Sequence, residues 1–168
     1  MSNQPDPTAV TEPRASRPRL PEGYGVPNSL LPWSFARERL EQAQNYWICT
    51  ASLDGRPHAA PLWGIWLDDQ FIFDGHPATR WGRNILANPY MSLHLENGTE
   101  VVMVEGVVED VNEPDRALYK RAADAYDAKY KFQLPDHGFF LLRPRAALGW
   151  TQFPGDATRW TFSQDSTT

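Results

Sequence analysis

The sequence is poor in cysteine, in long apolar runs and in basic runs. Cys49 is the single cysteine of 168 residues, which excludes an intrachain disulfide and favours a reducing, cytoplasmic compartment. No stretch approaches the ~20 apolar residues of a membrane helix, and the opening MSNQPDPTAV lacks the apolar core of a signal peptide. The net charge of −5, without a long basic run, argues against nucleic acid. We therefore expect a cytoplasmic protein whose partners include neither a membrane nor nucleic acid.

Motifs of several enzyme classes are also missing. The chain has no G-x-S-x-G and no P-loop, which argues against hydrolases and nucleoside triphosphatases. His76, His94 and His137 share no metal-ligand spacing with Cys49 or with each other, so we predict no metal site. We identify no catalytic nucleophile or base.

Aromatic residues and prolines are plentiful. Seven tryptophans are many for this length and are expected in the core, in a ring-lined pocket or at a dimer interface. Seven of the fifteen prolines fall within residues 1–32. This segment is interpreted as an extended or disordered arm, either solvated or draped over the fold, with a small basic patch of Arg14, Arg17 and Arg19. Residues 33–163 are expected to form one cofactor-binding domain, followed by a tail at 164–168.

Strand patterns dominate residues 33–163. Short turns, such as Asp54-Gly55 and Asn97-Gly98, join most neighbours. Ser34 is expected to cap the first helix, Pro114 to lie in the first turn of the last helix, and Gly106 to mark a bulge. The predicted helices are 33–45, 79–87 and 112–131, and the predicted strands are 46–52, 57–67, 70–74, 90–96, 100–111, 139–151 and 158–162. The expected fold is mainly β: an antiparallel barrel with peripheral helices.

The helix predicted after His76-Pro77-Ala78 has the features of an anion site. Its free N–H groups and its dipole favour negative charge, and Arg80 and Arg83 share one face of it. Thr79 and Asn84 complete this candidate phosphate site. The alternative is a solvated helix face.

The strand before that helix is rich in small residues and tryptophan. Pro61, Leu62, Trp63 and Gly64 are candidates to contact a flat ring system, since small residues allow close approach and backbone amides can bind the edge of the ring. A role of Trp63 as a simple core residue is an alternative of equal weight. His58 is a further candidate near the cofactor, although a satisfied polar residue is the more common role of a strand histidine.

Several segments together resemble a known superfamily. They read YWICTASLDGRPHAAPLWGIWLDDQFIFDG, ATRWGRNILANPYMSLHLENG, VVMVEGVVEDV and GWTQFPGDATRWTF, within residues 34–162. The pieces DGRPH…P-x-W-G, T-R-x-x-R-N-x-x-x-N-P and T-R-W-x-F resemble the split β-barrel flavin/deazaflavin oxidoreductases, which include the pyridoxamine 5′-phosphate oxidases. The nearest branch is the one called FDOR-B, whose members often use the deazaflavin F420. The resemblance implies a split β-barrel homodimer with cofactor sites at the subunit interface.

The resemblance also implies a function, an F420-dependent oxidoreductase that passes a hydride to or from a small organic substrate. An FMN-dependent, pyridoxamine-oxidase-like enzyme is the first alternative, and a non-catalytic binder of flavin, F420 or a tetrapyrrole is the second. Trp81 stands where many relatives carry a phosphate-binding lysine. The basic motif by which relatives hold pyridoxamine phosphate is not found near the terminal SQDSTT, so we do not expect vitamin B6 oxidation.

Further residues are assigned to the outer parts of the ligand. Arg56, Lys129 and Lys131 are candidates for the glutamate tail of F420. Trp63, Trp66, Trp150 and the arm are candidates to line the substrate pocket.

Overall fold

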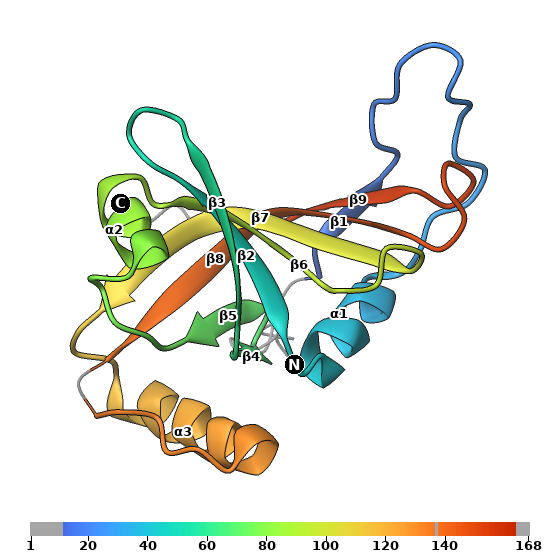
Figure 1. The fold of residues 1–168 in the computed structure, drawn as a ribbon. Helices are drawn as coiled ribbons and strands as arrows, with labels where there is room; N and C mark the ends of the chain where they lie inside the picture. Colours follow the sequence, from blue (N-terminus) through green and yellow to red (C-terminus); the bar gives the residue numbers. More distant parts are fainter. Residues whose placement is uncertain (1–11, 137, 164–168) are drawn as a thin grey trace, which may run out of the picture.

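A computed structural model describes residues 12–136 and 138–163 of the chain (Figure 1). The first eleven residues, His137 and the tail predicted at 164–168 lie outside the described residues. Within the described part the chain is mainly antiparallel β-sheet with three helices, as predicted. The helices are α1 (Trp33–Gln42), α2 (Arg80–Ala87) and α3 (Arg116–Tyr130), and the strands are β1 (Arg14–Ser16), β2 (Tyr46–Ala51), β3 (Pro57–Leu62), β4 (Ile65–Leu67), β5 (Gln70–Phe73), β6 (Tyr90–His94), β7 (Val101–Val111), β8 (Phe139–Trp150) and β9 (Thr158–Thr161).

The strands form one curved sheet in the order β1-β9-β8-β7-β6-β2-β3, and β5 joins it by pairing with β8 and β4. The chain passes from β3 to β4 through Trp63 and Gly64. In the described part of the chain β3 pairs with β2 alone, so the barrel is joined there by the covalent chain rather than by a strand ladder. This opening is the feature of a split barrel that leaves the outer edge of β3 accessible.

The long strand β8 holds the sheet together because its free edge serves two partners. Residues 140–142 pair with β5, whereas residues 146–149 pair with β9 (Figure 1). The β7–β8 register shifts between Glu105 and Gly106, which confirms the predicted bulge. A Cβ on Gly106 would lie 2.2 Å from the carbonyl oxygen of Arg143, so only glycine allows this approach.

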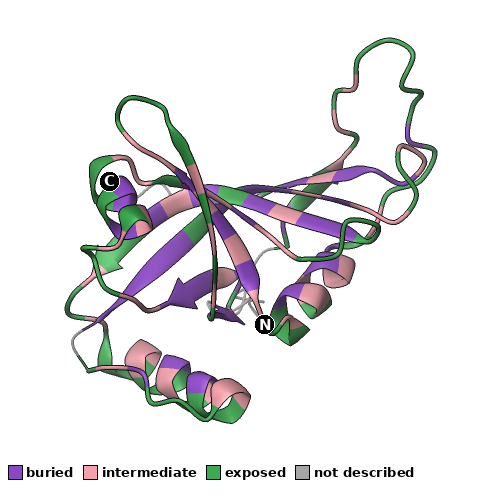
Figure 2. Ribbon diagram, in the orientation of Figure 1, coloured by how far each residue is buried: buried purple, intermediate pink, exposed green. Residues whose placement is uncertain are grey.

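Two apolar clusters fill the fold. The larger lies inside the barrel and includes Leu40, Tyr46, Phe71, Leu93 and Trp160. The smaller lies under α3, of which Ala122 and Tyr126, four residues apart, are buried. Figure 2 shows the burial concentrated on the central strands, whereas the turn between β2 and β3 and most of the loop of residues 17–32 are exposed.

Three local predictions were wrong. Ser34 lies inside α1, and the N-cap residue is Pro32, which offers no side-chain hydrogen bond. Pro114 precedes α3, because the Asp115 carboxylate caps the helix by accepting from the amides of Ala117 and Leu118. The strand predicted at 57–67 is divided at Trp63-Gly64 into β3 and β4. Hydrogen bonds of Gly64 to α3 occupy the backbone there.

Among the described residues, the longest helix has 15 residues and none is long and apolar enough to cross a membrane.

Candidate functional site

The start of α2 is held by local contacts. Thr79 is extended, and its Oγ1 accepts a hydrogen bond of 3.0 Å from the Gly82 amide, which makes Thr79 the N-cap. Gly82 packs against the preceding turn, since a Cβ there would lie 2.6 Å from the Pro77 carbonyl oxygen. A contact of Thr79 with a phosphate, as predicted, would therefore involve a side chain that already caps the helix.

Arg80 and Arg83 are both exposed on α2. Arg83 donates from Nη1 to the Ala78 carbonyl oxygen, and no acidic side chain in the described ranges pairs with either guanidinium. Trp81, between them, turns inward and packs its ring 5.5 Å from that of Phe140. Two cations without an acidic partner in the described part of the chain, beside a helix N-terminus, favour a bound anion.

Asn84 faces the barrel instead of the ligand site. It is buried, and its Nδ2 donates a 3.0 Å hydrogen bond to Thr50 Oγ1 on β2. Thr50 is the ladder partner of His58, which is half-buried on β3. The Asn84–Thr50 bond therefore fixes α2 beside the His58 end of β3, and Asn84 acts as a positioning residue.

The other end of β3 carries an exposed aromatic stack. The Trp63 side chain is 48% exposed, which rules out the simple core interpretation. Its ring lies almost parallel to that of Tyr130, with centroids 4.8 Å apart. Pro61 is exposed and Leu62 is half-buried next to it. The result is a flat, apolar surface at the point where the barrel is open.

Gly64 has a structural explanation. A Cβ there would lie 2.3 Å from the ring of Phe71, so its small size serves the core rather than the approach of a ligand. Its amide donates to the Tyr130 hydroxyl at 3.0 Å, and its carbonyl oxygen lies 2.7 Å from the same hydroxyl. The backbone of Gly64 is therefore already paired with α3.

Sequence reasoning assigned Lys129 to the wrong place and did not include Tyr130 among the candidate site residues. Lys129 donates from Nζ to the Tyr46 hydroxyl at 2.7 Å and to the Gly64 carbonyl at 3.2 Å. Burial lowers the pKa of Lys129 to about 8, and it raises the pKa of Tyr46. The expected contact of Lys129 with a glutamate tail does not fit this inward position. The four-residue spacing from Tyr126 to Tyr130 indicates in the sequence that Tyr130 shares the sheet-facing side of the helix with Tyr126.

One other assignment changes in the folded chain. Trp66 is buried and donates its indole N–H to Asp69 Oδ1 at 3.3 Å, so it belongs to the core rather than to a substrate pocket. Arg56 pairs with Asp54 at 2.8 Å at the exposed turn between β2 and β3. Lys131 ends α3 in a left-handed conformation.

The candidate residues thus form two groups along one strand. Arg80, Arg83 and His58 lie at one end of β3, and Pro61, Leu62 and Trp63 lie at the other. Trp63 lies five positions after His58, or roughly 17 Å along an extended chain. An elongated ligand with an anionic group at α2 and a flat ring near Trp63 would follow the open edge of β3.

Comparisons with known proteins identify the family to which this fold belongs. Residues 34–151 match the family model described as Pyridoxamine 5′-phosphate oxidase. A conserved hypothetical protein, Rv2991, from Mycobacterium tuberculosis has a TM-score of 0.60 at 19% identity, covering 73% of this chain and 86% of that one. A structure titled F420 Reductase has a TM-score of 0.52 at 26% identity, covering 79% of this chain and 100% of that one.

A third solved structure has a different stated role. HutZ, a heme storage protein from Vibrio cholerae, has a TM-score of 0.53 at 16% identity, covering 64% of this chain and 85% of that one. A search of curated proteins found no match. The shared fold is therefore compatible with more than one bound group.

Proposed function

The chain belongs to the pyridoxamine 5′-phosphate oxidase family, and from this premise we propose that it is an oxidoreductase that uses the deazaflavin F420 and acts on a small organic substrate. The observation that carries the proposal is the pair of exposed guanidiniums of Arg80 and Arg83 at the start of α2, a helix that contacts β3, with no acidic partner among residues 12–136 and 138–163. The open edge of β3 leads to the exposed Trp63 ring.

The residues present fit such a cofactor. Arg80, Arg83 and the first amides of α2 would hold its phosphate, and Leu62 and Trp63 would face its ring. The bound deazaflavin would supply the hydride. The protein would hold the substrate over the ring and exclude water, and this positioning lowers the barrier without a catalytic base.

The choice of F420 over FMN follows from charge. FMN carries a compact dianionic phosphomonoester, which benefits most from concentrated positive charge. F420 carries a phosphodiester with one charge, and its carboxylates lie farther out. Trp81 turns into the core where many relatives place a lysine, so two arginines supply the local charge. The likeness to a structure titled F420 Reductase supports the same choice.

Parallel titrations of F420 and FMN at low and moderate salt test the proposal. We expect F420 to bind at least tenfold more tightly than FMN, about 1.4 kcal/mol, and to weaken with salt. Arg80→Ala should weaken F420 binding by about 1.5–3 kcal/mol. Arg116→Ala is the matched control, because Arg116 is also the exposed first residue of a capped helix.

Three outcomes contradict the proposal in different ways. Tighter binding of FMN would move the assignment to the FMN enzyme. Binding of neither cofactor, with binding of heme, would favour a tetrapyrrole carrier. Equal losses in Arg80→Ala and Arg116→Ala would remove α2 from the site.

A further inference from the structure

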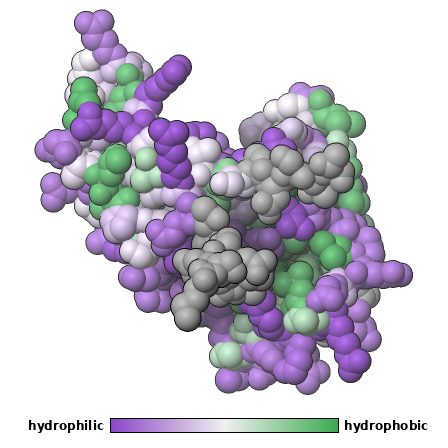
Figure 3. Space-filling model, turned by 180° about the vertical axis from the view of Figure 1, so that it is seen from behind, coloured by the Kyte–Doolittle hydropathy of each residue, from purple (hydrophilic) through white to green (hydrophobic). Residues whose placement is uncertain are grey.

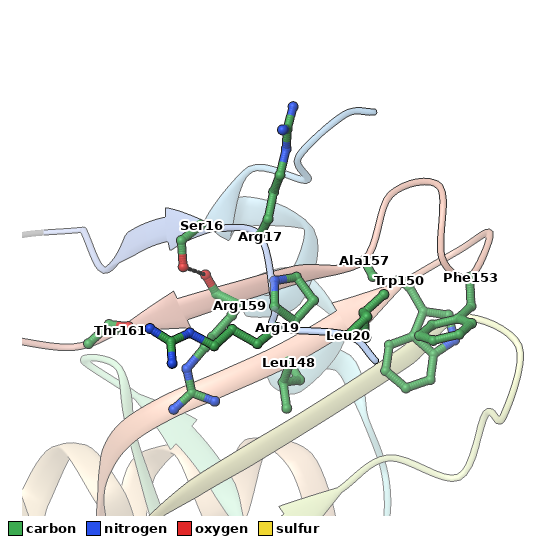
Figure 4. Close-up of a pocket in the computed structure, with 11 residues that line it drawn as sticks. Ser16, Arg17, Arg19, Leu20, Leu148, Trp150, Phe153, Ala157, Arg159 and Thr161 are labelled. Carbon is green, nitrogen blue, oxygen red and sulfur yellow. Dashed lines mark hydrogen bonds between the residues drawn. The ribbon is translucent and has the colours of Figure 1, made fainter. Parts of the chain in front are cut away.

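A cavity lies on the side of the molecule away from α2 (Figures 1 and 4). It has a volume of about 570 Å³ and lies between the arm and the outer faces of β8 and β9. Strand β1 pairs with β9 through Ser16↔Arg159. Pro18, which has no N–H to donate, follows this pair, and the chain rises off the sheet there. The cavity is the space left beneath the arm.

One end of the cavity is cationic. Figure 4 shows the side chains of Arg19 and Arg159 running in the same direction, with both guanidiniums toward Thr161, whereas Arg17 points away. No acidic side chain of residues 12–136 or 138–163 pairs with Arg19 or Arg159. Two like charges that face one cavity repel each other unless an anion lies between them. The planar guanidinium matches a carboxylate or a phosphate group.

The other end of the cavity is aromatic. Leu20, Trp150 and Phe153 gather there in Figure 4, and the Trp150 and Phe153 rings pack with centroids 5.3 Å apart. Phe153 is 45% exposed, so the ring is available to a ligand. Leu148 lies between the two ends and is the ladder partner of Arg159, which places both on the outer face of the sheet.

The same end of the molecule carries other exposed apolar side chains. Tyr24 packs edge-on against Phe153 with centroids 6.1 Å apart, and Val26 is also exposed. In the space-filling view, separate apolar patches lie among hydrophilic residues on this projecting end (Figure 3). Exposed apolar side chains thus lie close to the aromatic end of the cavity.

We propose that this cavity binds a small organic anion, with its carboxylate or phosphate between Arg19 and Arg159 and its aromatic body against Trp150 and Phe153. The volume lies within the roughly 300–1,000 Å³ of ligand sites, and an apolar lining with a few convergent polar groups is their usual composition. A solvated arm would not need two arginines of distant segments to converge beside an aromatic pair. The site does not depend on the proposed cofactor, because it shares no residue with α2 or β3.

Calorimetric titration of the full chain tests the site with three probes: 2-naphthoate, 2-naphthyl phosphate and the neutral 2-naphthamide. We expect at least one of the two anions to bind at least tenfold more tightly than the amide, and the tighter anion identifies the preferred group. Arg19→Gln and Arg159→Gln should each lower the affinity for that anion at least tenfold. Arg14→Gln should leave it unchanged, because Arg14 lies on β1 but does not line the cavity.

The proposal is overturned if neither anion binds at about 1 mM, if the amide binds as well as the anions, or if Arg14→Gln lowers the affinity as much as Arg19→Gln. Arg80→Ala separates this site from the cofactor site. It should leave the affinity for the anion unchanged even where F420 binding is lost, and a parallel loss would show that the cavity is no independent site. Arg19 is exposed on the arm, so Arg19→Gln tests the site even if Arg159→Gln unfolds β9.

Discussion

Gly64 shows how one residue joins the open and closed parts of the barrel. It follows the exposed Trp63, precedes the buried strand β4, and packs against the ring of Phe71. We expect Gly64→Ala to destabilise the protein by about 1–3 kcal/mol, because the added methyl group would overpack the core. Urea denaturation measures this free energy of unfolding.

Gly98→Ala is the control for that experiment. A Cβ on Gly98 would meet nothing within 4 Å, so its effect should stay within about 0.5 kcal/mol. Equal stability of Gly64→Ala and the wild type would show that the ring of Phe71 moves aside at little cost in free energy. It would also return Gly64 to the set of residues kept small for a ligand.

Lys129 makes the stability of the protein depend on pH. Burial lowers the pKa of its ammonium to about 8, from the ordinary 10.5 of an unfolded chain. The unfolded state thus binds more protons between these values, so this group stabilises the fold as the pH rises from about 8 toward 10.5, and the gain is lost below about 8.

Lys129→Met removes this titration. We expect the unfolding free energy of the wild type, relative to Lys129→Met, to rise between about pH 7.5 and pH 9.5. Urea titrations at several pH values measure the difference, in which the other titrating groups cancel. A difference independent of pH would show that water reaches the ammonium and that its pKa is ordinary.

At the scale of elements, the contact of α3 with the β3–β4 connection holds the candidate ring site in place. The Tyr130 hydroxyl accepts from the Gly64 amide and also lies 3.0 Å from the Gln44 carbonyl oxygen. Tyr130→Phe should destabilise the protein by about 1–3 kcal/mol, because it leaves the amide of the buried Gly64 without its acceptor. Hydrogen exchange of the Gly64 amide should accelerate as well.

Tyr24→Phe is the matched control, since Tyr24 is 56% exposed and its hydroxyl has no hydrogen-bond partner in the described part of the chain. The same loss in both variants would point to a general effect of removing a hydroxyl. If hydrogen exchange of the Gly64 amide is unchanged in Tyr130→Phe, another group holds the β3–β4 connection in place.

At the scale of the whole molecule, the outer edge of β3 points to a second copy of the chain. Pro57, Ala59 and Pro61 are exposed on one face of β3, beside this edge and next to Trp63. We propose a homodimer across this edge, since large exposed apolar surfaces usually mark interfaces. Sedimentation at micromolar concentration should show one species at twice 19.1 kDa.

Ala59→Arg should dissociate this dimer, because it introduces a charge into the proposed interface. Ala117→Arg, at an exposed position of α3, should not. A monomeric wild type that still binds cofactor would contradict the proposed assembly.

The sequence by itself determined the order and type of nearly every element. Alternation in β6, the Val-rich run of β7 and the four-residue stripe of α3 depend on local periodicity, which the chain carries without tertiary contacts. The bulge at Gly106 and the helix start at Thr79 were likewise readable, because glycine and a capping side chain act on their own backbone.

Tertiary structure decided which candidate residues face a ligand. Asn84 and Gly64 were plausible site residues, yet their polar groups pair with Thr50 and Tyr130, which lie 34 and 66 positions away along the chain. The cavity under the arm required Arg19 and Arg159 to meet across the fold. Such pairings are fixed by the packing of distant segments rather than by local periodicity. They therefore cannot be predicted from local patterns in the sequence.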